Sequence, residues 1–247
     1  KRTPLVYAKR LLPHMVFAVF LILTNAMVYK GLKNLHLDLS FVHALVISLL
    51  VGSLAFVVTK LLVKKIPYNA SWNLQKQFHE TENVFKYLQI LTAFYVAFAH
   101  GSNDVANAVG PLAAVVAILQ DGHVHMKVVM PPWILGLGGG FIVFGLLVWG
   151  AKVMATIGEK ITELTPSRGF AATFGAATVV LICSKMGLPI STTHTLVGSV
   201  IGVGLARGLA SLNFDIIKMI AISWISTIPF TAIISMLCYK IFLVFLP

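Results

Sequence analysis

Charged residues are scarce in this sequence, and acidic residues are the scarcest of them. Asp, Glu, Lys and Arg make up 11% of the 247 residues, and only eight residues are acidic. A typical soluble domain is about 25% charged and about 45–50% apolar, whereas this chain is 58% hydrophobic. A soluble fold of this length could not cover so much apolar surface, but a bilayer accepts it. We therefore expect an all-α, polytopic protein of the cell membrane (inner or plasma membrane) that contacts lipid.

Further absences narrow the function. The two cysteines, Cys183 and Cys238, lie in apolar segments, so we expect neither a disulfide framework nor a metal cluster. The sequence offers no recognisable nucleophile–base pair or metal triad, which argues against a membrane enzyme and against a cofactor. The formal net charge is +11, but the basic residues sit in short loops between apolar runs, as the positive-inside rule predicts. We therefore expect no nucleic-acid partner.

Long apolar runs predict the membrane spans, because about 20 apolar residues cross a bilayer. The predicted spans are 11–29, 41–63, 87–119, 133–154 and 216–246. The run 87–119 is too long for one simple span and is interrupted by Gly101–Asp104 and by Gly110–Pro111. The polar, lysine-containing stretch 64–86 is predicted as a loop that leads into a helix, and its basic residues place it in the cytoplasm.

Two shorter apolar runs, 170–186 and 190–206, flank Gly187-Leu188-Pro189. Each is near the lower limit for a span, and the break between them is tight. They could form a re-entrant helical hairpin or two complete spans joined outside the bilayer. We favour re-entry because many polar residues follow the break, and such broken helices line the binding sites of transporters.

Asp104 is the one acidic residue deep inside an apolar run. A lone ionisable group in hydrocarbon costs about 2.5–3.5 kcal/mol on insertion scales, so a partner must stabilise it. Ser102, Asn103 and Asn107 surround Asp104, and His100 precedes them. Such an oxygen-rich cluster suits a hard cation such as Na⁺, whereas the carboxylate itself suits a proton. The alternative is a structural helix break whose polar groups satisfy one another.

A second polar cluster, Ser191-Thr192-Thr193-His194-Thr195, follows Pro189 and opens an apolar run. Proline followed by hydroxyl residues marks a helix N-terminus, whose free N–H groups and positive dipole end bind anions. Hydroxyls add neutral hydrogen-bond donors. The alternative is ordinary N-capping by Ser191, although a cap needs only one hydroxyl.

Other residues have more than one interpretation. Lys185 lies close to the predicted hairpin tip, where it could face a bound oxyanion, pair with Asp104 or extend toward the membrane interface. The tryptophans, Trp224 among them, are interpreted as interface anchors. Two small-xxx-small pairs predict close helix packing. These pairs are Gly136 with Gly140 and Gly198 with Gly202.

Three stretches resemble the inorganic phosphate transporter (PiT) family. Residues 99–108 (AHGSNDVANA) resemble its G-x-N-D-V-A-N-A signature, and residues 164–170 (LTPSRGF) and 187–194 (GLPISTTH) look like two further motifs in the right order. The resemblance covers most of the chain from about Glu82 onward. It implies a symporter that imports inorganic phosphate with Na⁺ or H⁺, built from two inverted repeats that bind both ions between them.

The resemblance also implies roles for individual residues. The implied phosphate ligands are Asn103, Asn107, Ser191, Thr192 and Thr193. The implied cation ligands are Ser102, Asn103, Asp104, Asn107, Ser191 and Thr193. His100, Lys185 and His194 would support these ligands from behind.

The sequence departs from the family pattern because it holds one N-D signature and one S-T-T-H cluster. We expect the first-repeat copies in an upstream segment, a separate chain or a second copy of this chain in a homodimer. Residues 1–63 would then be two helices that link to the first repeat, 64–86 a cytoplasmic loop, and 87–247 the second-repeat transport domain. The rival functions are transport of sulfate or another oxyanion by the same fold, and a receptor or scaffold without transport.

Overall fold

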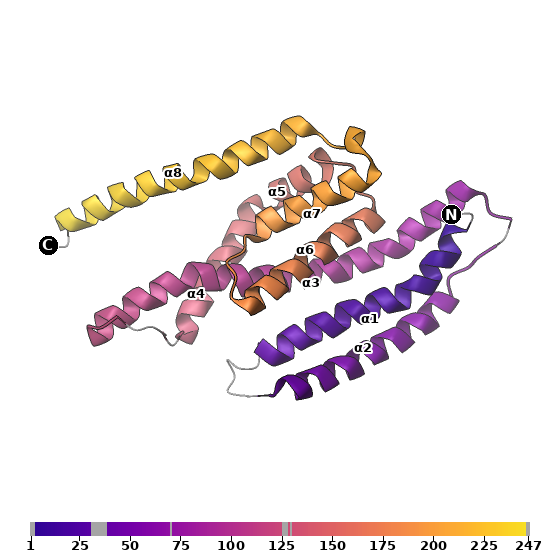
Figure 1. The fold of residues 1–247 in the computed structure, drawn as a ribbon, viewed down its shortest axis with the longest axis horizontal. Helices are drawn as coiled ribbons and strands as arrows, with labels where there is room; N and C mark the ends of the chain where they lie inside the picture. Colours follow the sequence, from indigo (N-terminus) through magenta and orange to yellow (C-terminus); the bar gives the residue numbers. More distant parts are fainter. Residues whose placement is uncertain (1–2, 31–38, 70, 125–127, 129, 246–247) are drawn as a thin grey trace.

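The computed structural model describes residues 3–30, 39–69, 71–124, 128 and 130–245. These residues form helices and no strand, and the long helices lie roughly along one direction (Figure 1). Within the described residues, six helical runs are long and apolar enough to cross a membrane. The predicted all-α, multi-pass fold is therefore confirmed.

The first two helices form an antiparallel pair. Helix α1 (Pro4–Lys30) packs along α2 (Phe41–Lys64), and both lie beside the remaining bundle (Figure 1). Ser40 begins α2 because its hydroxyl accepts the backbone N–H of His43. At the crossing, a Cβ on Gly52 would stand 3.1 Å from the α1 ring of Phe17, so glycine permits the close approach.

Helix α3 (Leu74–Asp121) starts earlier than the sequence predicts. The sequence predicts a loop over 64–86 that leads into a helix, but residues 74–86 are already helical and the connection between α2 and α3 covers only 65–73. The reason is a cap: the Asn73 side-chain oxygen accepts the backbone N–H of Lys76 at 2.8 Å. A capped polar helix end can extend beyond the apolar run that crosses the bilayer.

Helix α3 also continues through the sites where the sequence predicts interruptions. It passes Gly101–Asp104 without a break and keeps Pro111 inside the helix. The polar side chains of this stretch find partners on the neighbouring hairpin, so they do not need to open their own helix. Membrane helices tolerate an internal proline when neighbouring groups satisfy the freed backbone.

The fourth run returns antiparallel to α3 and contains two π-helical turns. It covers α4 (Pro132–Gly145), η2 (Leu146–Gly150), α5 (Ala151–Ala155) and η3 (Thr156–Lys160). The whole run is 29 residues long, and only its α4 part packs closely against α3. Such π-helical turns are rare and widen a helix locally.

The predicted break falls between α6 (Pro166–Met186) and α7 (Thr192–Arg207), which lie side by side as a hairpin (Figure 1). Gly187, at φ 74°, ends α6 in the left-handed conformation that glycine adopts without strain. Helix α7 has 16 residues and rises about 24 Å, which is less than the roughly 30 Å hydrocarbon core. Its length is consistent with the re-entrant hairpin that the sequence favours.

Helices α3 and α6 run parallel. Side-chain hydrogen bonds join them in the same order along both helices: Glu82 with Ser167, Thr92 with Thr173, Tyr95 with Thr178, and Asn103 with Ser184. Their packed face includes buried Tyr95 and Ala177. This alignment brings the C-terminal end of α6, and with it the hairpin turn, beside the polar signature on α3.

The last helix, α8 (Phe214–Phe245), follows a short 3-10 turn, η4 (Leu209–Ser211). None of its described residues is buried, and most of its length stands apart from the other helices (Figure 1). Its first turns, from Ile216 to Trp224, pack on the core cluster that holds Val197 and Val200 of α7. The predicted last span agrees with α8, apart from residue 246, which lies outside the described residues.

Candidate functional site

Asp104 is held by groups from two elements. Its Oδ2 accepts the Thr192 hydroxyl of α7 at 2.8 Å and lies 2.6 Å from Nε2 of His100, one turn earlier on α3. Its Oδ1 accepts the side-chain N–H of Asn103 at 2.8 Å. The carboxylate side chain is 31% exposed. A carboxylate at membrane depth therefore has three polar partners and a remaining open side.

Asn103 fastens the hairpin to α3. It is buried, its amide nitrogen also donates to the carbonyl of Ile190 at 3.0 Å, and its amide oxygen accepts the Ser184 hydroxyl at 3.0 Å. The two partners lie on either side of the hairpin turn. One side chain thus joins the end of α6, the turn before α7 and the neighbouring Asp104.

Ser191 begins α7. Its hydroxyl accepts the backbone N–H of His194 at 3.3 Å and lies 2.7 Å from Nδ1 of the same residue. Its carbonyl accepts the Thr195 hydroxyl at 2.8 Å. The sequence leaves N-capping and anion binding as alternatives, and the capping is present. A cap satisfies only part of a helix N-terminus, because the first turn carries several N–H groups without intrahelical partners.

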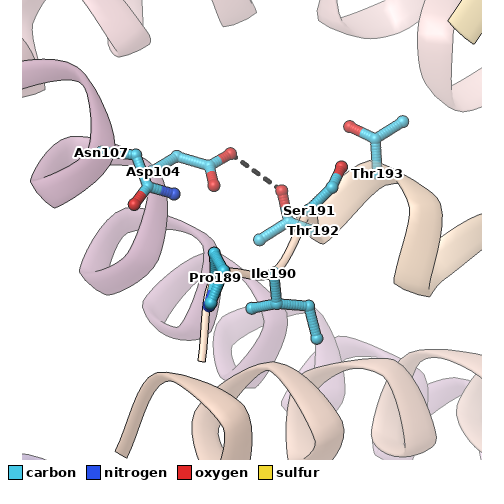
Figure 2. A pocket seen from close by; sticks show the side chains of 7 residues that line it. All are labelled: Asp104, Asn107, Pro189, Ile190, Ser191, Thr192 and Thr193. Carbon is cyan, nitrogen blue, oxygen red and sulfur yellow. Dashed lines mark hydrogen bonds between the residues drawn. The ribbon is translucent and has the colours of Figure 1, made fainter. Parts of the chain in front are cut away.

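An open pocket of about 460 Å³ lies between α3 and the hairpin turn. Figure 2 shows Asp104 and Asn107 facing the turn across it. The lining residues are Asp104, Asn107, Pro189, Ile190, Ser191, Thr192 and Thr193. For comparison, one water molecule occupies about 30 Å³. The pocket therefore has room for more than one small ion with bound water.

The pocket combines two kinds of electrostatics. The carboxylate of Asp104 gives one wall a negative charge, and the α7 N-terminus gives the other wall a partial positive charge and N–H donors. The amide of Asn107 and the hydroxyls of Ser191 and Thr193 add uncharged oxygen atoms. Hard oxygen donors suit Na⁺, and the described residues hold no group of three or more metal-ligating His, Cys, Asp or Glu. The pocket can therefore bind an oxyanion beside a small cation.

The structure separates the remaining candidate residues by position. Ser102 is not among the residues that line the pocket. Its hydroxyl donates to the Ala99 carbonyl within α3. Asn103 also lies behind the lining residues. His100 contacts Asp104, and His194 contacts Ser191.

Lys185 points toward the first two helices. Its ammonium group lies 5.0 Å from the ring centre of Tyr29 and 4.8 Å from that of Phe41. Cations over aromatic faces gain electrostatic attraction. The sequence leaves three interactions open for Lys185, and the structure excludes its pairing with Asp104. The side chain instead connects the hairpin tip to the α1–α2 pair.

Two contacts at the site are not predicted from the sequence. The Ser184 hydroxyl binds Asn103, and the Trp224 ring stacks on His194 at 3.7 Å between ring centres. Both join residues far apart in the chain, and no local pattern signals them. The pair His100 and Asp104 is different, because its i, i+4 spacing on one helix places the two side chains on one face.

The fold and pocket define a polytopic membrane protein with a polar pocket between a long helix and a helical hairpin. Residues 1–235 match the phosphate transporter family. The chain is 45% identical over 239 residues to a "putative phosphate permease" of Pyrococcus furiosus, covering 97% of this chain and 56% of that protein. It is 55% identical over 161 residues to the chloroplastic inorganic phosphate transporter 2-1 of Arabidopsis thaliana, covering 64% and 27%. The chain belongs to the phosphate transporter family.

A solved structure shows the same fold. It is a sodium-dependent phosphate transporter, and it superposes with a TM-score of 0.79 at 41% identity. The superposition covers 93% of this chain and 55% of that one. The chain thus spans about half the length of the relatives it matches.

Proposed function

We propose that this chain supplies one half of a secondary active transporter that imports inorganic phosphate by symport with Na⁺. The observation that carries the proposal is the pocket that pairs the carboxylate of Asp104 with the hydroxyl-rich N-terminus of α7. Family membership supports phosphate as the anion, and the sodium dependence of the superposed transporter supports Na⁺ as the cation. Transporters of this kind move ions by rearranging one repeat against the other.

The proposed ligands divide between the two walls of the pocket. Phosphate would accept hydrogen bonds from the hydroxyls of Ser191, Thr192 and Thr193 and from the first N–H groups of α7. Na⁺ would bind the carboxylate of Asp104 and the amide oxygen of Asn107, with the hydroxyl oxygens shared between the ions. Asn103 and Ser102 lie behind the lining, and we assign to Asn103 the role of holding the hairpin against α3.

The bond between Thr192 and Asp104 offers a physical reason for coupling. A hydroxyl carries a single proton, so Thr192 cannot donate to an anion while it donates to the carboxylate. A cation beside Asp104 would compensate the carboxylate and release this proton toward phosphate. Each ion would then favour binding of the other, and this reciprocal coupling is what symport requires.

The test is uptake of ³²P-phosphate into proteoliposomes that contain this chain with the segment that completes the transporter. An inward Na⁺ gradient should drive accumulation, and an inward proton gradient alone should not. Accumulation driven by protons alone would overturn the assignment of Na⁺. Excess sulfate should leave uptake unchanged, because phosphate at neutral pH still carries a proton that it can donate to Asp104. Strong competition by sulfate would identify the site as a general oxyanion site.

A further inference from the structure

Helix α8 contacts the first turn of α7, next to the pocket, through one aromatic side chain. The ring of Trp224 stacks on the imidazole of His194, with 3.7 Å between ring centres and 28° between ring planes. The same tryptophan packs on the core cluster around Val197 and Val200, two residues of α7 in the same hairpin. The indole is therefore fixed by packing on one side and covers His194 on the other.

The stack on Trp224 orients His194, which is hydrogen-bonded to the pocket-lining residue Ser191. With the ring plane of His194 held, Nδ1 stays 2.7 Å from the Ser191 hydroxyl. That hydroxyl oxygen also accepts the backbone N–H of His194. A serine hydroxyl has one donor and two acceptor positions. In the tautomer that carries the proton on Nδ1, His194 donates both hydrogen bonds, and the Ser191 hydroxyl keeps its own proton for the pocket that it lines. The orientation of His194 thus decides which way Ser191 presents its remaining position.

We propose that Trp224 is a positioning residue for the anion site, acting through His194 on Ser191. The inference rests on the proposed function, since Ser191 is there a phosphate ligand. A preorganised hydroxyl binds a charged ligand without first being ordered, so the benefit of Trp224 is expected in affinity. The maximal rate at saturating phosphate should depend on it much less.

Exposure separates Trp224 from the tryptophans that suit the membrane interface. Trp133 and Trp149 are 59% and 60% exposed on the surface of the fourth run. Trp224 is only partly exposed, and a ring contact occupies its face. Interface anchoring, which the sequence favours for every tryptophan, accounts for the exposed pair and leaves the His194 stack unexplained.

The test compares Trp224→Ala, Trp224→Phe and the exposed control Trp149→Ala in the complete transporter. Trp224→Ala should raise the half-saturation concentration for phosphate about 5- to 20-fold. The effect is smaller than that of deleting the hydrogen bond, because the Ser191 hydroxyl is still present and has lost only its fixed orientation. Trp224→Phe retains a stacking ring and should stay within about twofold of wild type. Trp149→Ala should match wild type. Equal half-saturation in Trp224→Ala and wild type would overturn the proposal, as would equal loss in Trp224→Ala and Trp224→Phe.

Two further measurements distinguish positioning from damage to the fold. In a Ser191→Ala background, Trp224→Ala should add no further loss of affinity, because the two residues act in one chain of contacts; an additive loss would refute the route through Ser191. Carbethoxylation of His194, followed by mass spectrometry, should be faster in Trp224→Ala than in wild type or Trp224→Phe. This readout needs no transport, so it tests the stack even if wild type shows no saturable phosphate uptake and the proposed function fails. If Trp224→Ala does not fold, Trp224→Leu replaces it with the same expected outcomes.

Discussion

The Thr192 hydroxyl donates to Asp104 Oδ2 at 2.8 Å, and this bond joins α7 to α3 across 88 residues of sequence. It links the first turn of the hairpin's second helix to the one carboxylate among the residues that line the pocket. A bond to an ionised acceptor is stronger than one between neutral groups. The bond therefore holds the first turn of α7 against α3 at the edge of the pocket.

Asp104→Asn should abolish Na⁺-driven phosphate accumulation and leave the protein folded. The amide keeps an acceptor for Thr192 but removes the charge that attracts the cation. The measurement is ³²P uptake against a Na⁺ gradient, with helical content by circular dichroism as the check on folding. The matched control is Asp215→Asn, which changes an exposed carboxylate in the first turn of α8. Concentrative uptake at the normal rate by Asp104→Asn would contradict the assignment.

Ser191→Ala and Thr192→Ala should each weaken phosphate affinity more than they lower protein yield. A hydrogen bond to a charged ligand is worth roughly 1.5–3 kcal/mol, which corresponds to about a 10- to 150-fold rise in the half-saturation concentration. Thr195→Ala is the control, because that hydroxyl donates to the Ser191 carbonyl and does not line the pocket. If half-saturation stays unchanged in both test variants, these hydroxyls only cap a helix.

Gly138→Ala should destabilise the contact between α3 and α4, whereas Gly139→Ala should not. A Cβ at Gly138 would overlap Cγ1 of Val109, a buried side chain with a stiff branch at its own Cβ, while Gly139 has no neighbour within 4 Å. Overpacking of this kind typically costs about 1–3 kcal/mol. The measurement is the thermal unfolding midpoint of each variant in detergent, which should be lower for Gly138→Ala. Equal midpoints would show that α3 and α4 accommodate the added methyl group without loss of stability.

The lengths of the apolar runs are sufficient to predict most helices, because the thickness of the hydrocarbon core sets the length of a span. The break at Gly187 and the polar clusters on either side of the pocket are also accessible from the sequence. Glycine is the residue that adopts a positive φ without strain, and polar groups in an apolar run are retained only where partners or ligands satisfy them. The continuity of α3 is not accessible in this way. Its polar signature is satisfied across the interface by the hairpin, and local sequence carries no record of that partner.

The positions of close helix packing are a second feature that the sequence alone does not predict. The small-xxx-small pairs predict contacts at Gly136, Gly140, Gly198 and Gly202, yet a Cβ on any of the four would meet nothing within 4 Å. The close approach on α4 occurs instead at Gly138. Spacing shows which glycines share a helix face, but only tertiary structure decides which face meets a neighbour.

The connection between α2 and α3 is expected to lie in the cytoplasm, because basic residues flank it. A single cysteine introduced as Ser71→Cys tests this in a background where Cys183 and Cys238 are alanine. Ser71 is exposed in the connection, and its neighbour Asn73 is avoided because it caps α3. An impermeant thiol reagent should label the cysteine only after permeabilisation. Labelling in intact cells would invert the orientation.

The last prediction is that these 247 residues do not transport phosphate by themselves. The pocket is open, and its described lining comes from α3, the hairpin turn and the first turn of α7. A singly or doubly charged anion at membrane depth needs donors on several sides, because its lost hydration must be replaced. In inverted-repeat transporters the second repeat supplies the opposite wall, and motion between the repeats gives alternating access.

The length of the relatives agrees with this argument, since the superposed sodium-dependent phosphate transporter has nearly as much chain again outside the matched part. The decisive comparison reconstitutes this chain alone and then with the first-repeat segment of a close relative. Only the second preparation should show saturable uptake driven by Na⁺. Uptake by the isolated chain would refute the half-site interpretation unless cross-linking showed a homodimer. In that case a second copy would supply the missing wall, and a mixture of wild-type and Asp104→Asn chains should lose activity faster than the mutant fraction rises.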